Sequence, residues 1–557
     1  MARNYYTPGV YVEEISTLAP SVAQVATAIP AFIGYTETGS GVKRIDTLLD
    51  YETAFGKAKP STFAITVNEN RDNQGNTSYE IKNEIKRDSG NPNPNPFLMY
   101  YGLSLYFRNG GGSCYIVSVG NYKNKDKDTV PNKTDFENGL ALLEKEDEPT
   151  LIVLLDAVNL SNNDYYDLCV AALTQCNNLQ DRFLITDVVP TSDKTDIETF
   201  RTKIKMDYLN YGAVYYPYLN TLLNYQYLEN NVTVTSNVYK SLIDKAVTVS
   251  YTGSSSAPKL IIKTGNPTQG NVDFDTTTKD TLTLTISSTT APKGTEVTSA
   301  WKTWKAANSN NVAGFDIVQN GDGSTTLAAS TPSFTLTLSN TLNELQTANT
   351  ALYNQIKLRL NDERVILPPS SAMAGIYARV DRERGVWKTP ANVSVATVLG
   401  PVSKISDADQ ETLNNDPTAG KSINAIRDFT GKGTLVWGGR TLAGNDNEWR
   451  YVSVRRLFIT IEESTKKATS FAVFEPNDAT TWLKVKAMIE SYLYGLWEQG
   501  ALAGSKPESA YFVNVGLGKT MTSQDILEGR MKVEIGIAAV RPAEFIILKF
   551  THKLQQA

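Results

Sequence analysis

The sequence predicts a multidomain α+β protein, and three patterns along the chain support this prediction. Short apolar runs alternate with helical stretches from about residue 30 to residue 228 and again after residue 350, which is typical of mixed α/β structure. Between these parts, residues 229–349 are rich in Thr, Ser, Asn and Gly and alternate as strands do. Both ends of the chain carry short extended segments. At 557 residues the chain is also too long for a single hydrophobic core.

The mixed α/β middle domain is expected over residues 29–228 together with 350–392. Its candidate strands are short apolar runs at residues 31–34, 114–119, 151–155, 182–186 and 212–216. Helical segments are expected between them at 97–107 and 165–178, and the helical stretch 351–365 follows the insertion. The polar, Asn-rich stretch Asn68–Pro96 is expected to be a surface loop.

Residues 229–349 are expected to form a small all-β insertion that projects from the main body. Apolar and hydroxyl side chains alternate in Leu282–Ile286 and again in Phe334–Leu338, which is the pattern of half-buried strands. A flexible low-complexity linker is the alternative that composition leaves open.

The C-terminal domain is expected over residues 393–540 with mixed α and β structure. Its clearest element is a helix over Asp478–Gln499, because Asn477 or Asp478 can cap its start and Gly500 can end it. The apolar residues of this helix recur at helical spacing: Trp482, Val485, Ile489, Tyr492, Leu493 and Leu496.

Two terminal arms are expected, at residues 1–28 and 541–557. Thr7–Ile15 is a short extended stretch opened by a Pro-Gly turn, and Phe545–Leu554 keeps one largely apolar face with period-two patterning. An unpaired strand is a template for strand addition, so these arms could join copies of the chain. The alternative is that both strands pair within their own subunit.

The side-chain inventory excludes the commonest catalytic chemistries. His552 is the only histidine, so Ser-His-Asp, Cys-His and His-ligated zinc sites lack their central residue. The three cysteines, Cys114, Cys169 and Cys176, form no CxxC pair and suggest a reducing compartment. Gly110–Gly112 precedes a strand, which is the reverse of a phosphate-binding loop. We therefore expect no enzyme, cofactor or metal site.

Charge and hydropathy limit the possible partners and location. The net charge of −5 argues against nucleic-acid binding, and no apolar run approaches the roughly 18 residues of a membrane span. The first residues lack the apolar core of a secretory signal, so synthesis and assembly in a cytoplasm are expected. If the protein acts outside a cell, lysis or another device must release it.

Arginines interleave with carboxylates in the second half of the chain. The densest set is expected to form ion pairs within or between subunits: Arg379, Asp381, Arg382, Arg384, Arg455 and Arg456, with Arg440 and Glu462 nearby. A site for a substrate phosphate is the sharper alternative.

Several blocks in a fixed order resemble contractile tail sheath proteins, which occur in bacteriophage tails and contractile injection systems. The blocks of the second half lie in Ser371–Asn392, Thr434–Leu442, Glu448–Ser464, Leu496–Pro507 and Pro542–Phe550. Those of the first half lie in Thr7–Glu14, Phe107–Val119 and Tyr215–Leu219. The resemblance covers nearly the whole chain except the Thr/Ser-rich insertion.

The resemblance implies a structural subunit that stacks in hexameric rings wound helically around an inner tube. The sheath would assemble in a metastable extended state and contract to drive the tube through a target envelope. It also implies an inner C-terminal domain, an insertion on the outer surface, and baseplate and terminal cap proteins as further partners, without nucleic acid or direct membrane insertion. Assembly in a bacterial cytoplasm would precede release of the particle.

Strand exchange between subunits is a further implication of the resemblance. The N-terminal arm strand would be Val10, Tyr11, Val12 and Glu13, and the C-terminal one Phe545, Ile546, Ile547, Leu548, Lys549 and Phe550. The receiving strand would include Lys532, Val533, Glu534 and Ile535. In the helix Asp478–Gln499, Lys484 and Lys486 are candidates to contact an acidic tube, although they could equally be solvated helix positions.

Two other classes of function remain open on composition alone. A non-contractile surface adhesin or shell protein would fit the Thr/Ser/Asn-rich insertion and the aromatic content of 10%. A carboxylate enzyme such as a glycosidase would rest only on abundant Asp, Glu and Trp. The sequence does not separate a phage tail from a phage-derived injection device.

Overall fold

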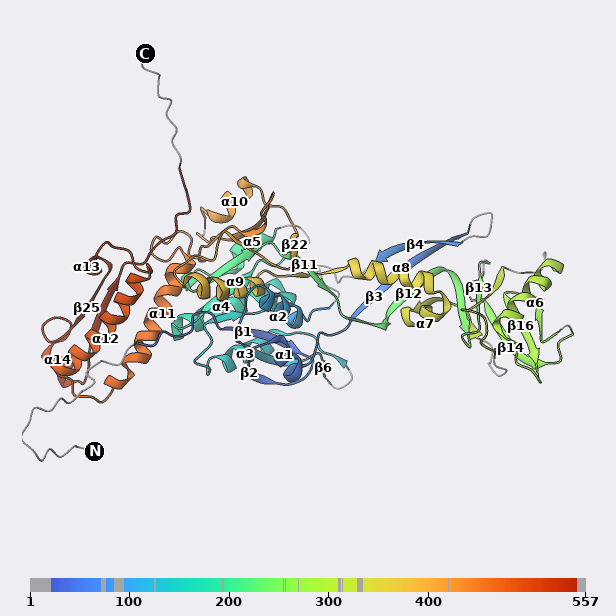
Figure 1. Ribbon diagram of the computed structural model, residues 1–557, viewed down its shortest axis with the longest axis horizontal. Helices are drawn as coiled ribbons and strands as arrows, with labels where there is room; N and C mark the ends of the chain where they lie inside the picture. Colours follow the sequence, from blue (N-terminus) through green and yellow to red (C-terminus); the bar gives the residue numbers. More distant parts are fainter. Residues whose placement is uncertain are drawn as a thin grey trace, which may run out of the picture.

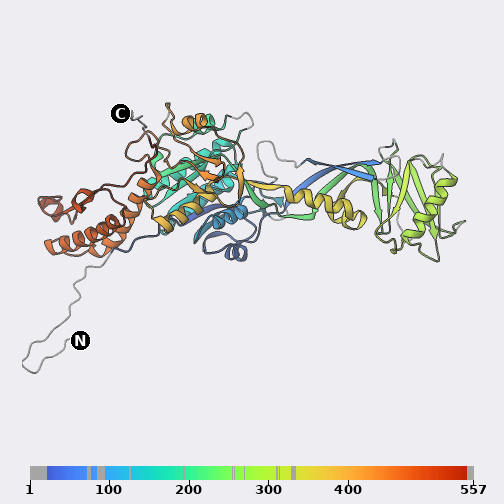
Figure 2. The same cartoon turned by 45° about the horizontal axis from the view of Figure 1, so that its top comes forward.

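The computed structural model is elongated, with three regions in a row (Figure 1). It describes residues 22–71, 77–84, 95–124, 127–191, 195–253, 255, 257–268, 270–308, 312, 314–327, 334–418 and 420–547. The C-terminal region lies at one end, an α/β body in the middle, and the insertion at the other end; a second view shows the same order (Figure 2). Each region has its own cluster of buried apolar side chains.

The body is built on a nine-stranded mixed sheet. Its order is β2 (Gly41–Ile45), β5 (Cys114–Asn121), β1 (Pro30–Thr36), β8 (Leu151–Val153), β9 (Phe183–Asp187), β10 (Gly212–Tyr216), β23 (Asn424–Phe429), β24 (Gly433–Val436) and β21 (Val393–Ser394). The strands from β5 to β23 are parallel, and the others pair antiparallel at the edges. The five strands expected from apolar runs, which became β1, β5, β8, β9 and β10, are confirmed.

Helices cover both faces of the body sheet, because neighbouring residues of β1 meet different helices. The ring of Phe32 lies 5.1 Å from the ring of Tyr106 in α2, whereas Ile33 faces Gly139 in α3. Successive side chains of a strand point to opposite faces, so α2 and α3 flank the sheet. The helices of the body are α1 (Leu48–Phe55), α2 (Met99–Arg108), α3 (Lys133–Leu143), α4 (Asn162–Leu179), α5 (Asp196–Lys203), α9 (Ser370–Arg384) and α10 (Asp407–Asn414).

Two buried carboxylates hold helix starts at the carboxyl ends of neighbouring strands. Asp156 accepts hydrogen bonds from the amides of Tyr35 (2.7 Å) and Leu98 (2.6 Å), which begins α2. Asp187 accepts one from the amide of Ser370 (2.8 Å), the first residue of α9. Burial raises the pKa of both carboxyl groups to about 7, although these hydrogen bonds oppose the shift. Each carboxylate thus satisfies a free amide at the start of a helix from a different part of the chain.

The body also shows two differences from the expected division of the chain. A small sheet of β20 (Arg364–Leu367), β11 (Leu219–Asn224) and β22 (Val398–Pro401) lies beside the main sheet, and both sheets use strands after residue 392. Apolar residues up to Ile459 belong to the body core. The body therefore continues well past the boundary expected at residue 392, and the C-terminal core is formed by Val386 together with α11 (Val452–Ala468) and the elements after it.

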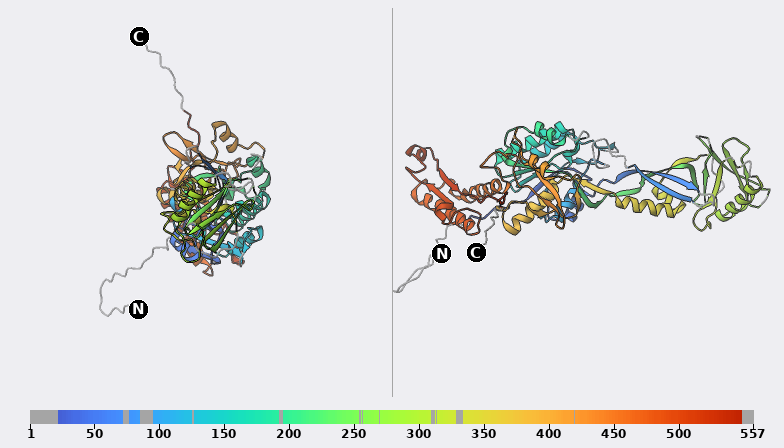
Figure 3. Two further views of the ribbon diagram at one scale, coloured as in Figure 1. Left: turned by 90° about the vertical axis from the view of Figure 1, so that its right-hand side faces the viewer. Right: turned by 90° about the horizontal axis from the view of Figure 1, so that it is seen from above.

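A long ribbon connects the body to the insertion. Its central strand is β12 (Tyr227–Ile243), whose 17 residues span roughly 56 Å at about 3.3 Å per residue. The sheet order is β17 (Phe315–Gln319), β13 (Val247–Tyr251), β12, β3 (Ser61–Arg71) and β4 (Thr77–Glu84), and β19 (Thr337–Thr341) also pairs with β12. The helices α7 (Leu342–Ala348) and α8 (Thr350–Asp362) return along it (Figure 3).

The surface loop expected at Asn68–Pro96 is therefore wrong in part. The end of β3 and all of β4 lie in this stretch and pair antiparallel, from Ala64 with Glu84 to Arg71 with Thr77. The alternation of Phe63, Ile65 and Val67, all about 1% exposed, marked β3 in the sequence.

The insertion is α+β, so the all-β prediction is wrong. It contains the sheet β15 (Val272–Asp275), β16 (Thr281–Ser287), β14 (Lys259–Gly265) and β18 (Phe334–Thr335). The helix α6 (Gly294–Ala307) packs with these strands, because Val297 and Trp301 at helical spacing enter the same buried cluster. Trp301 is 1% exposed and lies 5.1 Å from the ring of Phe274. The ordered core argues against the linker alternative.

Candidate assembly interface

The C-terminal region is a narrow layer of two long helices against a hairpin. The helix α12 (Ala479–Glu498) confirms the helix expected over Asp478–Gln499, with the Asp478 carboxylate accepting a hydrogen bond from the amide of Thr481 (2.9 Å). It packs with α11 and with the short helix α13 (Pro507–Ala510), and the short helix α14 (Ser523–Leu527) lies in the same region. Its buried apolar residues are Val485, Met488, Ile489, Leu493 and Leu496, while Trp482 and Tyr492 are only half-buried.

The hairpin has only two strands, β25 (Tyr511–Val515) and β26 (Val533–Ile537). They pair antiparallel from Tyr511 with Ile537 to Val515 with Val533. In the part of the chain that the structure describes, no third strand joins either edge. Val533, Glu534 and Ile535 of the predicted strand lie in β26, whereas Lys532 precedes it. A free strand edge can accept further strands, and the receiving role stays a prediction.

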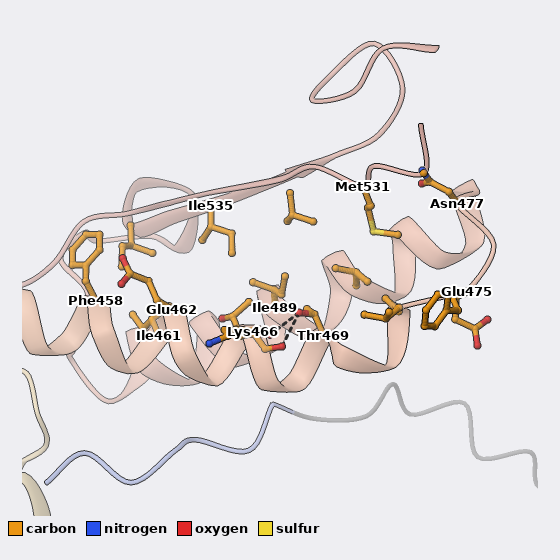
Figure 4. Close-up of a pocket in the computed structure, with 18 residues that line it drawn as sticks. Phe458, Ile461, Glu462, Lys466, Thr469, Glu475, Asn477, Ile489, Met531 and Ile535 are labelled. Carbon is orange, nitrogen blue, oxygen red and sulfur yellow. Dashed lines mark hydrogen bonds between the residues drawn. The ribbon is translucent and has the colours of Figure 1, made fainter. Parts of the chain in front are cut away.

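An apolar groove of about 930 Å³ lies between this hairpin and the helices. In Figure 4, Met531 and Ile535 face Ile461 of α11 and Ile489 of α12 across it. On the helix side Ile461 and Ile489 are buried, whereas Val533, Ile535 and Ile537 on the strand side remain half-buried. The hairpin is too narrow to cover the apolar surface of the helices, which leaves the groove open.

The tail that follows the hairpin exposes three large apolar residues. Phe545 is 73% exposed, and Ile546 and Ile547 are each 80% exposed. These residues have irregular backbone, so the strand expected from Phe545 does not form within the subunit over the described part. Leu548, Lys549 and Phe550 lie outside the described residues, as do Val10, Tyr11, Val12 and Glu13.

The two candidate tube-contact lysines differ in their surroundings. Lys484 is exposed on α12, whereas Lys486 is half-buried and its Nζ lies 3.5 Å from the Glu490 carboxylate one turn away. An i,i+4 pair of this kind on a helix surface contributes about 0.3–0.5 kcal/mol. Lys486 is therefore partly neutralised within its own helix.

The arginine set forms ion pairs, but with several different partners. Arg456 pairs with Asp381 through Nη1 (3.0 Å) and Nη2 (2.5 Å), and both side chains are at most 5% exposed. Arg455 pairs with Glu462 at 3.0 Å and stacks over Tyr211. Both arginines are thus in ion pairs within the subunit.

The other arginines of the set bind backbone or face solvent. Arg379 donates to the carbonyl of Ser394 (2.8 Å), and Arg382 donates to that of Gly110 (3.2 Å). Arg384 is exposed at the end of α9. No carboxylate is brought to these three in the described ranges, so a role in ion pairs between subunits stays a prediction.

Sequence reasoning missed the partner of Arg440. Its Nε and Nη2 bind the Glu544 carboxylate at 2.9 and 2.7 Å, and Tyr451 donates to the same carboxylate at 3.2 Å. Glu544 lies 104 residues from Arg440 in sequence. No local pattern marks such a pair, and only the block similarity around Pro542–Phe550 drew attention to this segment.

The described residues were also compared with the requirements of a metal site and of a membrane-spanning helix. Across the ranges that the structure covers, no group of three or more His, Cys, Asp or Glu side chains is placed to hold a metal ion. Within the same ranges, no helix is both long and apolar enough to cross a bilayer. The three cysteines are buried and free, and burial raises their pKa values above the ordinary range.

An open-edged hairpin, an apolar groove and an exposed apolar tail are features of a structural subunit that joins other chains. Comparison with known proteins shows a similarity to one family over the C-terminal part of the chain. Residues 444–553 match the family model of the phage tail sheath C-terminal domain.

Curated relatives match over part of the chain. It is 26% identical over 144 residues to the tail sheath protein of Vibrio phage KVP40, and 24% identical over 137 residues to that of Enterobacteria phage T4. These stretches cover 26% and 25% of this chain, and 21% and 20% of the relatives, so they span about a fifth of the curated relatives.

Solved structures match from end to end. The sheath of an extracellular contractile injection system, PVC, in its contracted state is 26% identical, with a TM-score of 0.54 and 99% of both chains covered. The contracted helical sheath of the anti-feeding prophage is also 26% identical, with a TM-score of 0.55 and 99% and 100% of the two chains covered. The resemblance to contractile tail sheath proteins is thereby confirmed.

Proposed function

We propose that this chain is the sheath subunit of a contractile phage tail or injection particle. Copies would stack as six-fold rings around an inner tube in a metastable extended state, and contraction would drive the tube through a target envelope. The observation that carries this proposal is the match over 99% of the chain to sheath subunits in a contracted state. A baseplate assembly of the anti-feeding prophage matches equally well, which supports a baseplate as a further partner.

The terminal arms would link the subunits by strand addition. Phe545–Phe550 of one subunit and Val10–Glu13 of another would pair with the open edges of β25 and β26 in a third, with Lys532–Ile535 on the receiving side. The groove and the exposed Phe545–Ile547 support this, since both present apolar surface that an added strand would cover.

The strength of one such link can be judged from its backbone hydrogen bonds. Each backbone hydrogen bond contributes about 0.5–1.5 kcal/mol net, so a pairing along the five residues of β26 contributes several kcal/mol. Two arms per subunit make simultaneous release improbable. The mesh would thus persist while the bodies rotate, and contraction would draw on better contacts between bodies in the shorter state.

The C-terminal region would face the tube, and the insertion would face outward. The two lie at opposite ends of the elongated molecule, which supports this orientation (Figure 1). Lys484 and Lys486 would offer positive charge to an acidic tube through few, polar contacts that break during the stroke. The two arms, at residues 1–28 and 541–557, would lie outside these domains.

Truncation tests the arm. The chain would be expressed with its neighbouring genes as full-length protein, as a chain ending at Glu544, and as a control ending at Phe550 that keeps the expected strand. Electron microscopy should show long striated cylinders for the full chain and the control, and their loss in the chain ending at Glu544. Cylinders in all three preparations would retain the sheath and reject the arm. Single particles in every preparation would favour the adhesin or shell protein.

A further inference from the structure

The helix α11 belongs to two hydrophobic cores at once. Val452 and Ile459 lie in the buried cluster of the body, whereas Leu457 and Ile461 lie in that of the C-terminal region. In each view α11 runs from the body sheet into the C-terminal layer (Figures 1 and 2). A movement between the two regions therefore involves this helix.

The described start of the chain is fixed to α11. The carbonyl of Thr27 accepts a hydrogen bond from Arg456 Nη2 at 2.8 Å, and the amide of Val25 donates to Ser464 Oγ at 3.1 Å. Arg456 and Ser464 lie on α11, two turns apart. Arg456 is itself fixed by the buried Asp381 of α9, so the N-terminal segment is attached to a rigid group.

The C-terminal segment is fixed at the start of the same helix. Tyr451 is the N-cap of α11 and binds the Glu544 carboxylate, which also forms the bidentate pair with Arg440. The backbones of Arg440 and Tyr451 form an isolated antiparallel bridge. The Arg440 and Glu544 side chains are 10% and 20% exposed, so solvent screens this pair less than a surface pair.

Among the described residues of the tail, Glu544 is the last with a hydrogen bond to the rest of the subunit. Arg541 still donates to the carbonyl of Asn447 at 2.8 Å, whereas Phe545, Ile546 and Ile547 are exposed. The bidentate geometry fixes a direction as well as a distance. Glu544 therefore marks the point at which the tail leaves its own subunit.

We propose that α11 is the shared anchor of both terminal arms, with Arg440 and Arg456 as its positioning residues. This inference rests on the arm exchange proposed above and adds where each arm is held. The N-terminal root is held by Arg456 of α11, and the C-terminal root is held by Arg440 and by Tyr451, the N-cap of α11. A rotation of α11 therefore moves both arms together. When the body of one subunit moves, the anchored arms move with it and pull on the neighbouring subunits. Arms without anchors would absorb the same movement by changing their own conformation.

The anchor can be measured in the unassembled chain with a nitroxide spin label at Phe545→Cys. The native cysteines are fully buried, so the introduced thiol is labelled selectively. Glu544→Gln removes the charge of the anchor, and Arg440→Lys keeps the charge but loses the fork. Glu528→Gln is the matched control, since its pair with Arg530 at 2.7 Å is exposed (37% and 62%).

We expect an immobilised spectral component in the parent and in Glu528→Gln, its loss in Glu544→Gln, and its reduction in Arg440→Lys. Equal mobility in the parent and in Glu544→Gln would overturn the anchor. In assembled sheaths, Glu544→Gln should still form cylinders, because the arm is present, but a larger fraction should break on contraction. Unbroken contracted sheaths at the parent's frequency would overturn the proposed transmission. Failure of arm exchange itself would appear separately, as normal cylinders from the chain ending at Glu544.

Discussion

The buried ion pair between Arg456 and Asp381 gives the strongest quantitative prediction. Asp381→Asn keeps the shape of the side chain but removes the charge that balances a guanidinium only 3% exposed. Breaking a buried pair in this way costs about 3–5 kcal/mol. In a body of this size each kcal/mol shifts the melting temperature by about 2–4 °C, so we expect the body transition to fall by roughly 6–20 °C.

Asp147→Asn is the matched control, because it makes the same chemical change opposite another cation of α11. Asp147 lies 2.8 Å from Lys467, but its side chain is 73% exposed, and such surface pairs contribute about 0–1 kcal/mol. Lys467 also keeps Glu463 at 3.3 Å. Calorimetry of both variants measures the difference. Equal shifts in the two variants would refute the reasoning that burial decides the cost.

Three further predictions concern the body, the C-terminal helix and the insertion. Asp156 and Asp187 have folded pKa values of about 7, above the unfolded value of about 3.9, so the stability they contribute is complete below the unfolded pKa and is lost as pH rises through about 7. The melting temperature should therefore decline over this range, and Asp187→Asn should flatten the decline between pH 5 and pH 8. An unchanged slope in Asp187→Asn would contradict this prediction. A Cβ at Gly375 would lie 2.4 Å from the Tyr106 carbonyl oxygen, so Gly375→Ala should lower the melting temperature. A Cβ at Gly495 in α12 would meet nothing within 4 Å, so Gly495→Ala should raise the free energy of unfolding by up to about 1 kcal/mol. The opposite order would contradict the packing of α2 on α9. Trp301→Ala should cost about 3–5 kcal/mol in the insertion alone, and limited proteolysis should then cut the insertion while the body stays intact; simultaneous loss of both would show that the two cores unfold together.

The body was predictable because its parallel strands are buried on both faces. Such strands appear in the sequence as short, uninterrupted apolar runs, and Leu151–Val153 and Phe183–Asp187 needed no tertiary information. By contrast, α6 lies among Thr- and Ser-rich strands, and its helical signal rests on the spacing of Val297 and Trp301. Composition therefore outweighed periodicity there, and the prediction was wrong.

The interface was predictable only in outline. The hairpin strand after Lys532 and the capped helix from Asp478 carry local signals, and both are present. The groove between them depends on how these elements pack, and the pairing of Arg440 with Glu544 depends on contacts across 104 residues. A single sequence predicts that arginines will pair but does not say with which carboxylates.

The most direct test of this account is a cryo-electron microscopy map of the sheath assembled from this chain with its inner tube. The account predicts that β25 and β26 lie within a wider sheet, whose added strands trace back to Val10–Glu13 and Phe545–Phe550 of neighbouring subunits. A map in which the hairpin remains two-stranded, or in which both arms return to their own subunit, would contradict it.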